Sequence, residues 1–396
     1  MRELTYVRPR RLEWRERPDP SLETPTDALV RPFVAGRCDG DTLPLHHRVS
    51  RPMQLGLTLG GIDPIVRHIA GSPPFHGPFG IGHECVAQIT AVGEEVSDLE
   101  VGDIVVVPWA ISCGTCDRCR QGLTAKCATT TTTTPGGTLS AFGFGTQCGR
   151  WGSMIADTVR VPFADHMLVK VPAGLAPLKV ASASDNLADA WRAVVPHLRE
   201  RPEGAVLVIG GGAKSIGLYA AGLAVAHGAG TVDYVDHDDE RLEIAERLGA
   251  TSYKSGGHGK VGTALRRVNM RYDIAVEASS RQRGLDAALR MLAPGGICTA
   301  TGYYVARRSR LPVMSMYAAS ATLHAGVSHV RPILPELLDF VAATGFESDL
   351  VTTTVADWDQ APHVYATRTT KLVLHRAPLP PKERPSTGRP PPHSDS

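Results

Sequence analysis

A glycine-rich junction between a strand and a helix constrains this chain more than any other feature of its sequence. Ala205–Ile209 is a short apolar run, rich in β-branched residues, that ends in three consecutive glycines. Ile216–Ala226 is apolar and long enough for a helix, and a second strand-like run, Thr231–Val235, follows it. A strand, a tight turn, a helix and a second strand in this order are typical of a right-handed βαβ crossover. The sequence therefore predicts a parallel sheet with the glycines at the end of a buried strand.

The same junction predicts a binding site for a dinucleotide. Glycines at the start of a helix let a pyrophosphate approach backbone N–H groups and the positive end of the helix dipole. Asp236 ends the second strand, where a carboxylate accepts hydrogen bonds from the adenosine ribose and leaves no room for a 2′-phosphate, so NAD is favoured over NADP. The predicted contacts are Gly210, Gly212, Ser215, Ile216, Gly217 and Asp236.

The glycine motif departs from the usual fingerprint in one respect. In the pattern G-x-G-x-x-G the last glycine follows the second by three residues, whereas Gly217 comes two residues late. An ordinary tight turn before a helix is the alternative interpretation. The preceding strand, the following helix and the distance to Asp236 together favour cofactor binding.

Composition limits the class of protein. The chain has 396 residues, 42% of them hydrophobic and 21% charged, so it can bury a large core and should divide into two domains. A formal net charge of +2 gives no reason to expect nucleic acid or an anionic membrane as a partner. We expect a cytoplasmic protein, because Met1–Pro20 is charged throughout and no run approaches the ~20 apolar residues of a membrane span. In a reducing compartment, clustered cysteines indicate metal binding.

The two halves of the chain have different patterns. Short β-type runs in the first half predict an irregular β-rich region: Ala28–Ala35, Val86–Val92, Ile104–Val107 and Thr158–Pro162. From about residue 188 strands and helices alternate, which predicts a doubly wound parallel sheet of the α/β class: Val206–Ile209, Leu218–Ala226, Val232–Val235, Glu240–Leu248, Ile274–Ala278, Leu285–Leu292 and Ile297–Thr301. A helix at Leu334–Thr344 and a strand at Lys371–Leu374 follow. We expect Thr129–Thr134 to be an exposed loop and residues 377–396 to be disordered.

Four cysteines form a metal-binding pattern. Their spacing is C-x2-C-x2-C-x7-C, at Cys113, Cys116, Cys119 and Cys127. Four thiolates within one loop complete a tetrahedral zinc and leave no position for water, so such a site is structural. Disulfides or a redox sensor are the alternatives, but the compartment and the spacing favour zinc.

Together with this lobe, a Gly82-His83-Glu84 motif and the dinucleotide-binding pattern make the chain resemble the zinc-containing alcohol dehydrogenases of the medium-chain dehydrogenase/reductase superfamily. The resemblance covers about residues 29–374. It implies a GroES-like catalytic domain over residues 1–187, with a structural zinc lobe at about 110–130. It further implies a Rossmann NAD-binding domain over 188–327 and a return to the catalytic domain over 328–376.

The resemblance also implies a second, catalytic zinc between the domains, held by Cys38, His83 and Asp185. One thiolate and one carboxylate neutralise Zn²⁺, and three protein ligands leave a fourth position open for an alcohol. Each ligand has an alternative interpretation: Cys38 as a small buried residue, His83 as a core imidazole and Asp185 as the N-cap of a helix.

Further residues receive roles from the same resemblance. Asp41 is expected to orient the histidine ligand, and Glu84 to support the ligands or to become a transient one. Arg241 is expected to approach the adenosine ribose.

Two departures from the family pattern affect the predicted site. The family usually carries Ser or Thr two residues after its first cysteine ligand, as a proton relay, where this chain has Gly40. Thr42, His46 or His47 could replace that relay. The ligands Cys38 and His83 are also farther apart in sequence than in the family, with the extra material in 42–78. We expect this insertion to form a partly apolar wall of the substrate pocket, because it lies between two ligands and the region holds Leu55, Leu57, Phe75, His76 and Phe79.

The sequence therefore predicts an oxidoreductase with two zinc ions per chain. It would transfer a hydride between NAD(H) and an alcohol, aldehyde or ketone bound to the catalytic zinc. One alternative, suggested by Gly40, is a reductase of aldehydes, imines or activated alkenes, or a dismutase-like enzyme. Another is a non-catalytic scaffold that keeps the fold and the structural zinc. The expected partners are a small alcohol or carbonyl substrate and further copies of the chain, in a homodimer or homotetramer.

Overall fold

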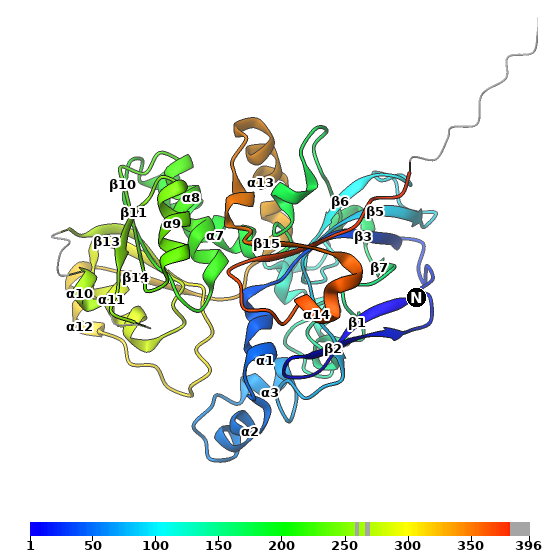
Figure 1. The fold of residues 1–396 in the computed structure, drawn as a ribbon, viewed down its shortest axis with the longest axis horizontal. Coiled ribbons are helices and arrows are strands. Elements are labelled where there is room, and N and C mark those ends of the chain that lie inside the picture. Colours follow the sequence, from blue (N-terminus) through cyan, green and yellow to red (C-terminus); the bar gives the residue numbers. More distant parts are fainter. Residues whose placement is uncertain (258–260, 266–269, 381–396) are drawn as a thin grey trace, which may run out of the picture.

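A computed structural model describes residues 1–257, 261–265 and 270–380 of the chain (Figure 1). A parallel sheet flanked by helices lies on one side, and a β-rich region built from both ends of the chain lies on the other. Of the tail predicted to be disordered, residues 381–396 lie outside the described residues. In the described part of the chain, no helix is both long and apolar enough to span a membrane.

The parallel sheet confirms the predicted doubly wound pattern. Its strand order is β11-β10-β9-β12-β13-β14, and every neighbouring pair is parallel. β9 lies in the middle of the sheet and is buried because its side chains are apolar on both faces. The strands are β9 (Ala205–Ile209), β10 (Thr231–Asp236), β11 (Thr251–Lys254), β12 (Tyr272–Glu277), β13 (Leu292–Ala300) and β14 (Thr322–Ala325).

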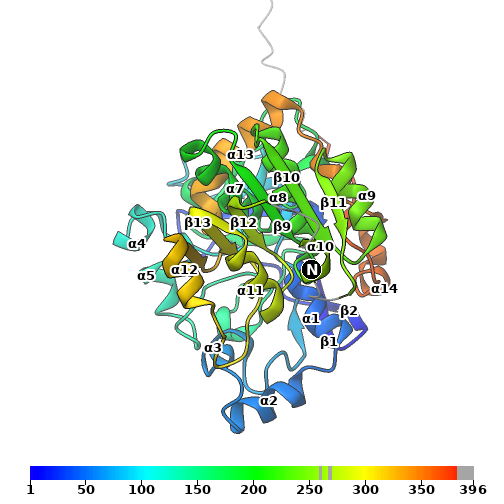
Figure 2. The same cartoon turned by 90° about the vertical axis from the view of Figure 1, so that its left-hand side faces the viewer.

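Helices cover both faces of this sheet (Figure 2). The long helices α7 and α8 pack against each other, and α7 is buried along most of its length. Their contact joins the sheet to the core of the β-rich region. The helices are α7 (Asn186–Glu200), α8 (Lys214–Ala226), α9 (Asp239–Arg247), α10 (Gly262–Leu265), α11 (Gln282–Arg290), α12 (Val313–Ala319) and α13 (Val330–Thr344).

The β-rich region is built around strand β3 (Ala28–Gly36). Its main sheet has the order β15-β16-β3-β5-β6-β8, with β7 also paired to β3. β16 pairs antiparallel to β3, with Leu374 opposite Ala35, so a segment that follows the parallel sheet in sequence returns to the sheet that contains β3. The other strands are β5 (Cys85–Val92), β6 (Ile104–Val107), β7 (Val159–Val161), β8 (Val169–Lys170), β15 (Thr354–Asp357) and β16 (Leu372–His375).

Smaller elements complete this region. A sheet of order β2-β1-β4 covers one side, with β1 (Arg2–Arg8), β2 (Arg11–Glu16) and β4 (Phe79–Gly80). Short helices connect the strands: α4 (Asp117–Arg120), α5 (Ala128–Thr131), α6 (Ala164–Met167) and α14 (Ala361–Val364). The domain boundaries 1–187, 188–327 and 328–376 stay predictions, because strand pairing shows which segments associate but not where a domain ends.

The predicted insertion forms a helical arm beside the parallel sheet. It contains α1 (Thr42–His46), α2 (Ser50–Thr58) and α3 (Ile65–Ala70). The backbone of this arm pairs with the segment after β13: the Asp63 amide donates to the Val305 carbonyl at 3.0 Å, and Ile62 forms a β-bridge with Ala306. The arm therefore connects the two halves of the molecule.

Candidate functional site

A cavity of about 500 Å³ lies where the two halves of the molecule meet. This volume is within the range of small-molecule sites. One wall comes from the β-rich region and α7, and the other from the carboxyl ends of the parallel strands, where ligands bind in open α/β sheets. The lining includes Cys38, Gly40, Trp109, Phe144, Asp185 and Asp189 on the first side, and Gly212, Ile216, Ser280, Thr301, Tyr303 and Val327 on the second.

Three predicted metal ligands converge at one end of this cavity. Cys38 follows β3, His83 precedes β5 and Asp185 precedes α7. The Asp185 Oδ2 atom lies 3.0 Å from Cys38 Sγ and 3.3 Å from His83 Nε2. The donor atoms of the three residues all lie within 4.8 Å of one another. A thiol, an imidazole and a carboxylate at this spacing fit a zinc ion with one open position.

The surroundings of His83 determine which ring nitrogen faces Cys38 and Asp185, the other two predicted metal ligands. Its Nε2 points to Asp185, and its Nδ1 lies 3.7 Å from Asp41 Oδ1 and has no hydrogen-bond partner among the described residues. The Tyr365 hydroxyl donates to the other Asp41 oxygen at 2.8 Å. Burial opposes protonation of His83, but Asp41 and Asp185 outweigh it and raise the pKa of the imidazole. This geometry matches the predicted orienting role of Asp41.

Asp185 precedes α7 but does not cap it. Its side chain makes no capping hydrogen bond. The Glu84 Oε1 atom instead accepts from the Asn186 amide at 2.9 Å, so the cap comes from a carboxylate 102 residues away. The alternative interpretation of Asp185 as an N-cap side chain therefore has no support in the structure, and its carboxylate is free to face Cys38 and His83.

Glu84 lies behind the ligands in a fully buried ion pair. Its Oε2 accepts from Lys371 Nζ at 2.6 Å, and both side chains are 0% exposed. Lys371 also donates to Asn186 Oδ1 and to the Arg37 carbonyl, each at 2.9 Å. Burial opposes the charge on Lys371, yet the adjacent carboxylate raises its pKa. Both oxygens of Glu84 are thus engaged by protein groups, which fits a supporting residue better than a transient ligand.

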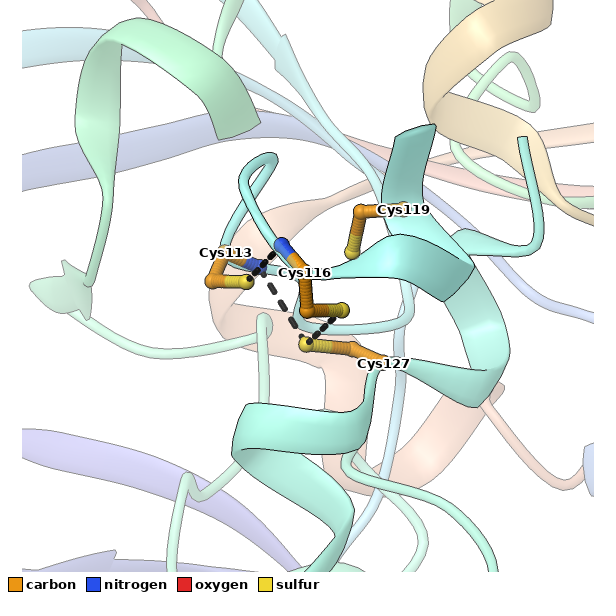
Figure 3. A group of neighbouring side chains, drawn as sticks. All are labelled: Cys113, Cys116, Cys119 and Cys127. Atoms are coloured by element: carbon orange, nitrogen blue, oxygen red, sulfur yellow. Dashed lines mark hydrogen bonds between the residues drawn. The ribbon is translucent and has the colours of Figure 1, made fainter. Parts of the chain in front are cut away.

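The four cysteines gather in a separate lobe (Figure 3). The sulfur atoms of Cys113, Cys116, Cys119 and Cys127 lie within 4.8 Å of one another. Backbone amides point at these sulfurs: Cys116 N lies 3.4 Å from Cys113 Sγ, and Cys113 N lies 3.4 Å from Cys127 Sγ. Amide donors stabilise thiolates, so the lobe fits a closed, four-thiolate zinc site.

The threonine run after the fourth cysteine is only partly the exposed loop that its sequence predicts. Thr130, Thr131 and Thr134 are buried, and their hydroxyls donate to backbone carbonyls. The Thr129 hydroxyl lies 3.3 Å from Cys113 Sγ. Burial opposes ionisation of Cys113, but this hydroxyl and others lower the pKa of the thiol to about 5. The run therefore supports the cysteine lobe.

The glycine loop lies at the predicted place, but several of its amides are already bonded within the chain. Gly212 and Ala213 donate to the carbonyls of Ser279 and Ala278. The amides of Ser215 and Ile216 donate to Asp39 Oδ2 at 2.8 Å and 3.2 Å. The cavity has room for the nicotinamide end of a dinucleotide. The amides of Ser215 and Ile216, which would hold its pyrophosphate, are instead hydrogen-bonded to the Asp39 carboxylate.

Asp236 and Arg241 are paired with each other. The Arg241 Nε and Nη2 atoms each lie 2.7 Å from a different Asp236 oxygen. The Tyr234 hydroxyl and the His237 amide also donate to this carboxylate, and the Asp236 side chain is 0% exposed. Contact of both residues with a ribose stays a prediction, and it requires part of this network to open.

None of the three side chains predicted to replace the relay lies in the cavity, whereas Tyr303 lies next to Gly40. The Thr42 hydroxyl donates to the Asp39 carbonyl and His46 bonds to the Ala366 carbonyl; neither they nor His47 line the cavity. A Cβ atom on Gly40 would lie 2.8 Å from the Tyr303 hydroxyl oxygen, so Tyr303 fills the space that a side chain at position 40 would need. Only the absence of a side chain at Gly40 hinted at this contact.

Comparisons with known proteins show which proteins this chain resembles. Residues 24–173 match the alcohol dehydrogenase GroES-like domain, and residues 215–343 match the zinc-binding dehydrogenase domain. A probable zinc-binding alcohol dehydrogenase of Mycobacterium tuberculosis is 30% identical over 354 residues, which are 88% of this chain and 80% of that protein. A probable D-xylulose reductase A of Aspergillus fumigatus is 27% identical over 294 residues, 72% of this chain and 70% of that protein. The solved alcohol dehydrogenase from Thermus sp. ATN1 has a TM-score of 0.78 and 29% identity, covering 95% of this chain and 99% of that one.

Replacing Cys116 or Cys119 by serine should release one metal ion and lower the melting temperature. A closed site that loses one thiolate loses much of its affinity, and the lobe around it loosens. Metal analysis by mass spectrometry and thermal unfolding would measure both effects, with Cys298→Ser as a buried control outside the lobe. Unchanged metal content and melting temperature in the Cys116 and Cys119 variants would contradict a structural metal site in the cysteine lobe.

Asp185→Asn should remove a metal ion from the other cluster while the melting temperature hardly moves. Asparagine has nearly the same shape, so packing at the start of α7 is preserved, but the ion loses one of its two neutralising charges. Cys38→Ser should give the same metal loss, and the cysteine lobe should keep its ion in both variants. A variant that retains both metal ions and normal turnover would show that Asp185 is no ligand.

Proposed function

Because the chain belongs to the zinc-type alcohol dehydrogenases of the medium-chain dehydrogenase/reductase superfamily, we propose that it interconverts an alcohol and its carbonyl compound with NAD(H) as hydride carrier. The observation that carries this proposal is the convergence of Cys38, His83 and Asp185 on a cavity at the carboxyl ends of the parallel strands. That arrangement supports a Lewis-acid site next to a nicotinamide site.

The proposed metal content is two zinc ions per chain. Zinc at Cys38, His83 and Asp185 would supply a Lewis acid that polarises the substrate oxygen. Zinc at the cysteine lobe would hold that loop in place without taking part in chemistry. Asp41 Oδ1, 3.7 Å from His83 Nδ1, would orient the His83 ring, and the Glu84–Lys371 pair holds the start of α7 beside Asp185. These supporting groups keep the three ligands in a single geometry.

Tyr303 is the proposed replacement for the missing Ser or Thr relay. Its hydroxyl lies against Gly40 inside the cavity, while the residue as a whole is 55% exposed. A bound NAD would supply the hydride acceptor for alcohol oxidation. Tyr303 would take the substrate hydroxyl proton at its oxygen while its own hydroxyl proton passes to water. This path supports a dehydrogenase over the alternative of a relay-free reductase.

The substrate proposed for this site carries an apolar group. A second, almost entirely apolar pocket adjoins Gly40 and Tyr303, and the insertion forms one of its walls. Its lining includes Leu43, Met53, Val66, Phe75, Phe79 and Val305. The other residues expected in this wall, Leu55, Leu57 and His76, do not line the pocket, and Leu55 is 58% exposed. A screen that compares alkyl and aryl alcohols and aldehydes with polyhydroxy compounds tests the proposal, with the change in NADH absorbance as the measure of activity. Activity confined to polyhydroxy compounds would contradict an apolar substrate pocket.

We also propose that the chain forms a homodimer, alone or within a homotetramer. β14 is an edge strand of the parallel sheet, and the neighbouring α12 exposes Val313, Met314 and Tyr317 by 64%, 75% and 78%. An unpaired strand edge beside exposed apolar side chains favours pairing with a second copy. Light scattering of the purified protein measures the oligomeric state.

The combined change Asp236→Ala with Asp238→Asn should raise the ratio of kcat/KM for NADP over NAD at least tenfold. Wild type should prefer NAD, because Asp236, Asp238 and Glu240 place negative charge at the end of β10. Removing Asp236 also releases the Arg241 guanidinium, which can then pair with a 2′-phosphate. Asp238→Asn alone is the control. A wild-type preference for NADP would contradict the proposed preference.

Tyr303→Phe should lower kcat for alcohol oxidation at least tenfold near neutral pH and leave the Kd for NADH unchanged, because the ring stays and only the hydroxyl is lost. Tyr317→Phe, which is exposed and outside the cavity, is the control. The double change Gly40→Ser with Tyr303→Ala should recover part of the lost kcat, since the serine hydroxyl then has room. Normal kcat and pH dependence in Tyr303→Phe would exclude the tyrosine from proton transfer.

A further inference from the structure

The residue after the first metal ligand reaches across the cleft to the start of a helix. Asp39 lies in a short 3₁₀ turn after β3, and its Oδ2 atom accepts three hydrogen bonds from α8. The donors are the Ser215 amide at 2.8 Å, the Ser215 hydroxyl at 3.0 Å and the Ile216 amide at 3.2 Å. The α8 helix has no cap of its own, because Ala213 makes no side-chain hydrogen bond. Asp39 therefore acts as the cap of α8 from the other half of the molecule.

This contact is buried and held from both sides. Asp39 is 6% exposed, and its own amide donates to Asn186 Oδ1 at 3.2 Å. The Ser215 hydroxyl also lies 3.3 Å from the same Asn186 oxygen. The carboxylate is thus part of an ordered network that joins η1 (Asp39–Asp41), α7 and α8, and it does not project into solvent.

The same helix end is where the glycine motif would place the pyrophosphate of a dinucleotide. A pyrophosphate and the Asp39 carboxylate are both anions, and both require the amides of Ser215 and Ile216. The amides of Gly212 and Ala213, which precede Lys214 in the loop, already donate to the carbonyls of Ser279 and Ala278 in the segment after β12. The cofactor's pyrophosphate and Asp39 therefore cannot occupy the start of α8 together.

We propose that Asp39 is a built-in competitor of the cofactor pyrophosphate: NAD(H) binds at α8 only when Asp39 leaves the helix, so this residue sets the cofactor affinity. The inference rests on the proposed function, because it needs a dinucleotide in the cleft. Asp39 also lies between Cys38 and the Gly40–Asp41 segment, so its movement on cofactor binding shifts the turn that carries a metal ligand and the partner of His83.

Titration of NADH into zinc-loaded wild type and Asp39→Asn, followed by cofactor fluorescence, tests the proposal. Asparagine is the same size but carries no charge, so it holds the α8 amides less strongly. We expect the Kd for NADH to fall at least tenfold and the melting temperature of the cofactor-free protein to fall as well. If Asp39 only holds the two halves of the molecule together, its substitution would lower the melting temperature and leave the Kd for NADH unchanged.

Two further variants keep the test decisive. Ser215→Ala leaves the charge in place but removes one of the three bonds, so it should tighten NADH by a smaller factor even if Asp39→Asn folds poorly. Asp27→Asn is the matched control: Asp27 is fully buried and accepts backbone amides of Glu23 and Thr24 far from the cleft, so its loss should lower the melting temperature and leave the Kd unchanged.

The outcomes separate this inference from the proposed function. If wild type binds NADH as tightly as Asp39→Asn and Ser215→Ala, or more tightly, Asp39 does not compete with the cofactor. The proposed dehydrogenase function is unaffected by that result. Failure of NADH to bind wild type and all variants would overturn the proposed cofactor and the competition together.

Discussion

A buried ion pair between Glu84 and Lys371 holds the centre of this molecule together. The two side chains come from positions 287 residues apart, and neither is exposed to solvent. Such a pair is stable only while its remaining polar atoms are bonded, and removal of one partner costs about 3–5 kcal/mol. Here Lys371 is satisfied by Asn186 and the Arg37 carbonyl, and Glu84 by the Asn186 amide. Gly36 makes the packing possible, because a Cβ atom there would lie 2.2 Å from the carboxylate.

The geometry of the metal cluster depends on this pair. Because Glu84 caps α7, Asp185 does not have to, and its carboxylate can face Cys38 and His83. The neighbouring residue of the Gly-His-Glu motif, His83, has its Nδ1 atom 3.7 Å from Asp41, which is itself held by the Tyr365 hydroxyl. Burial and the nearby Asp185 carboxylate raise the pKa of Cys38, so a cation at the cluster would release the thiol proton as it binds. The supporting residues and the ligands therefore form one connected unit.

The cleft is crossed on two sides by contacts that have no part in holding metal. On one side Asp39 bonds to the start of α8, and on the other the helical arm pairs its backbone with residues 305 and 306. Tyr303 belongs to the same segment as the second contact and points back to Gly40. Gly40, the helical arm and the tyrosine thus occupy one region beside the cavity.

The sequence by itself determined the elements and the ligand spacing. Strands such as β9 and helices such as α13 follow from apolar periodicity, and the cysteine lobe follows from four residues within one loop, because these patterns depend on neighbours along the chain. Tertiary structure alone decided that Glu84 rather than Asp185 caps α7, that Arg241 closes Asp236, that Asp39 reaches α8 and that Tyr303 fills the space at Gly40. With the exception of the Asp236–Arg241 pair, which lies five residues apart, these contacts join positions about 100 to 260 residues apart. Periodicity reports which residues are buried, but a buried polar group takes whichever partner the packing of distant segments brings within hydrogen-bond distance.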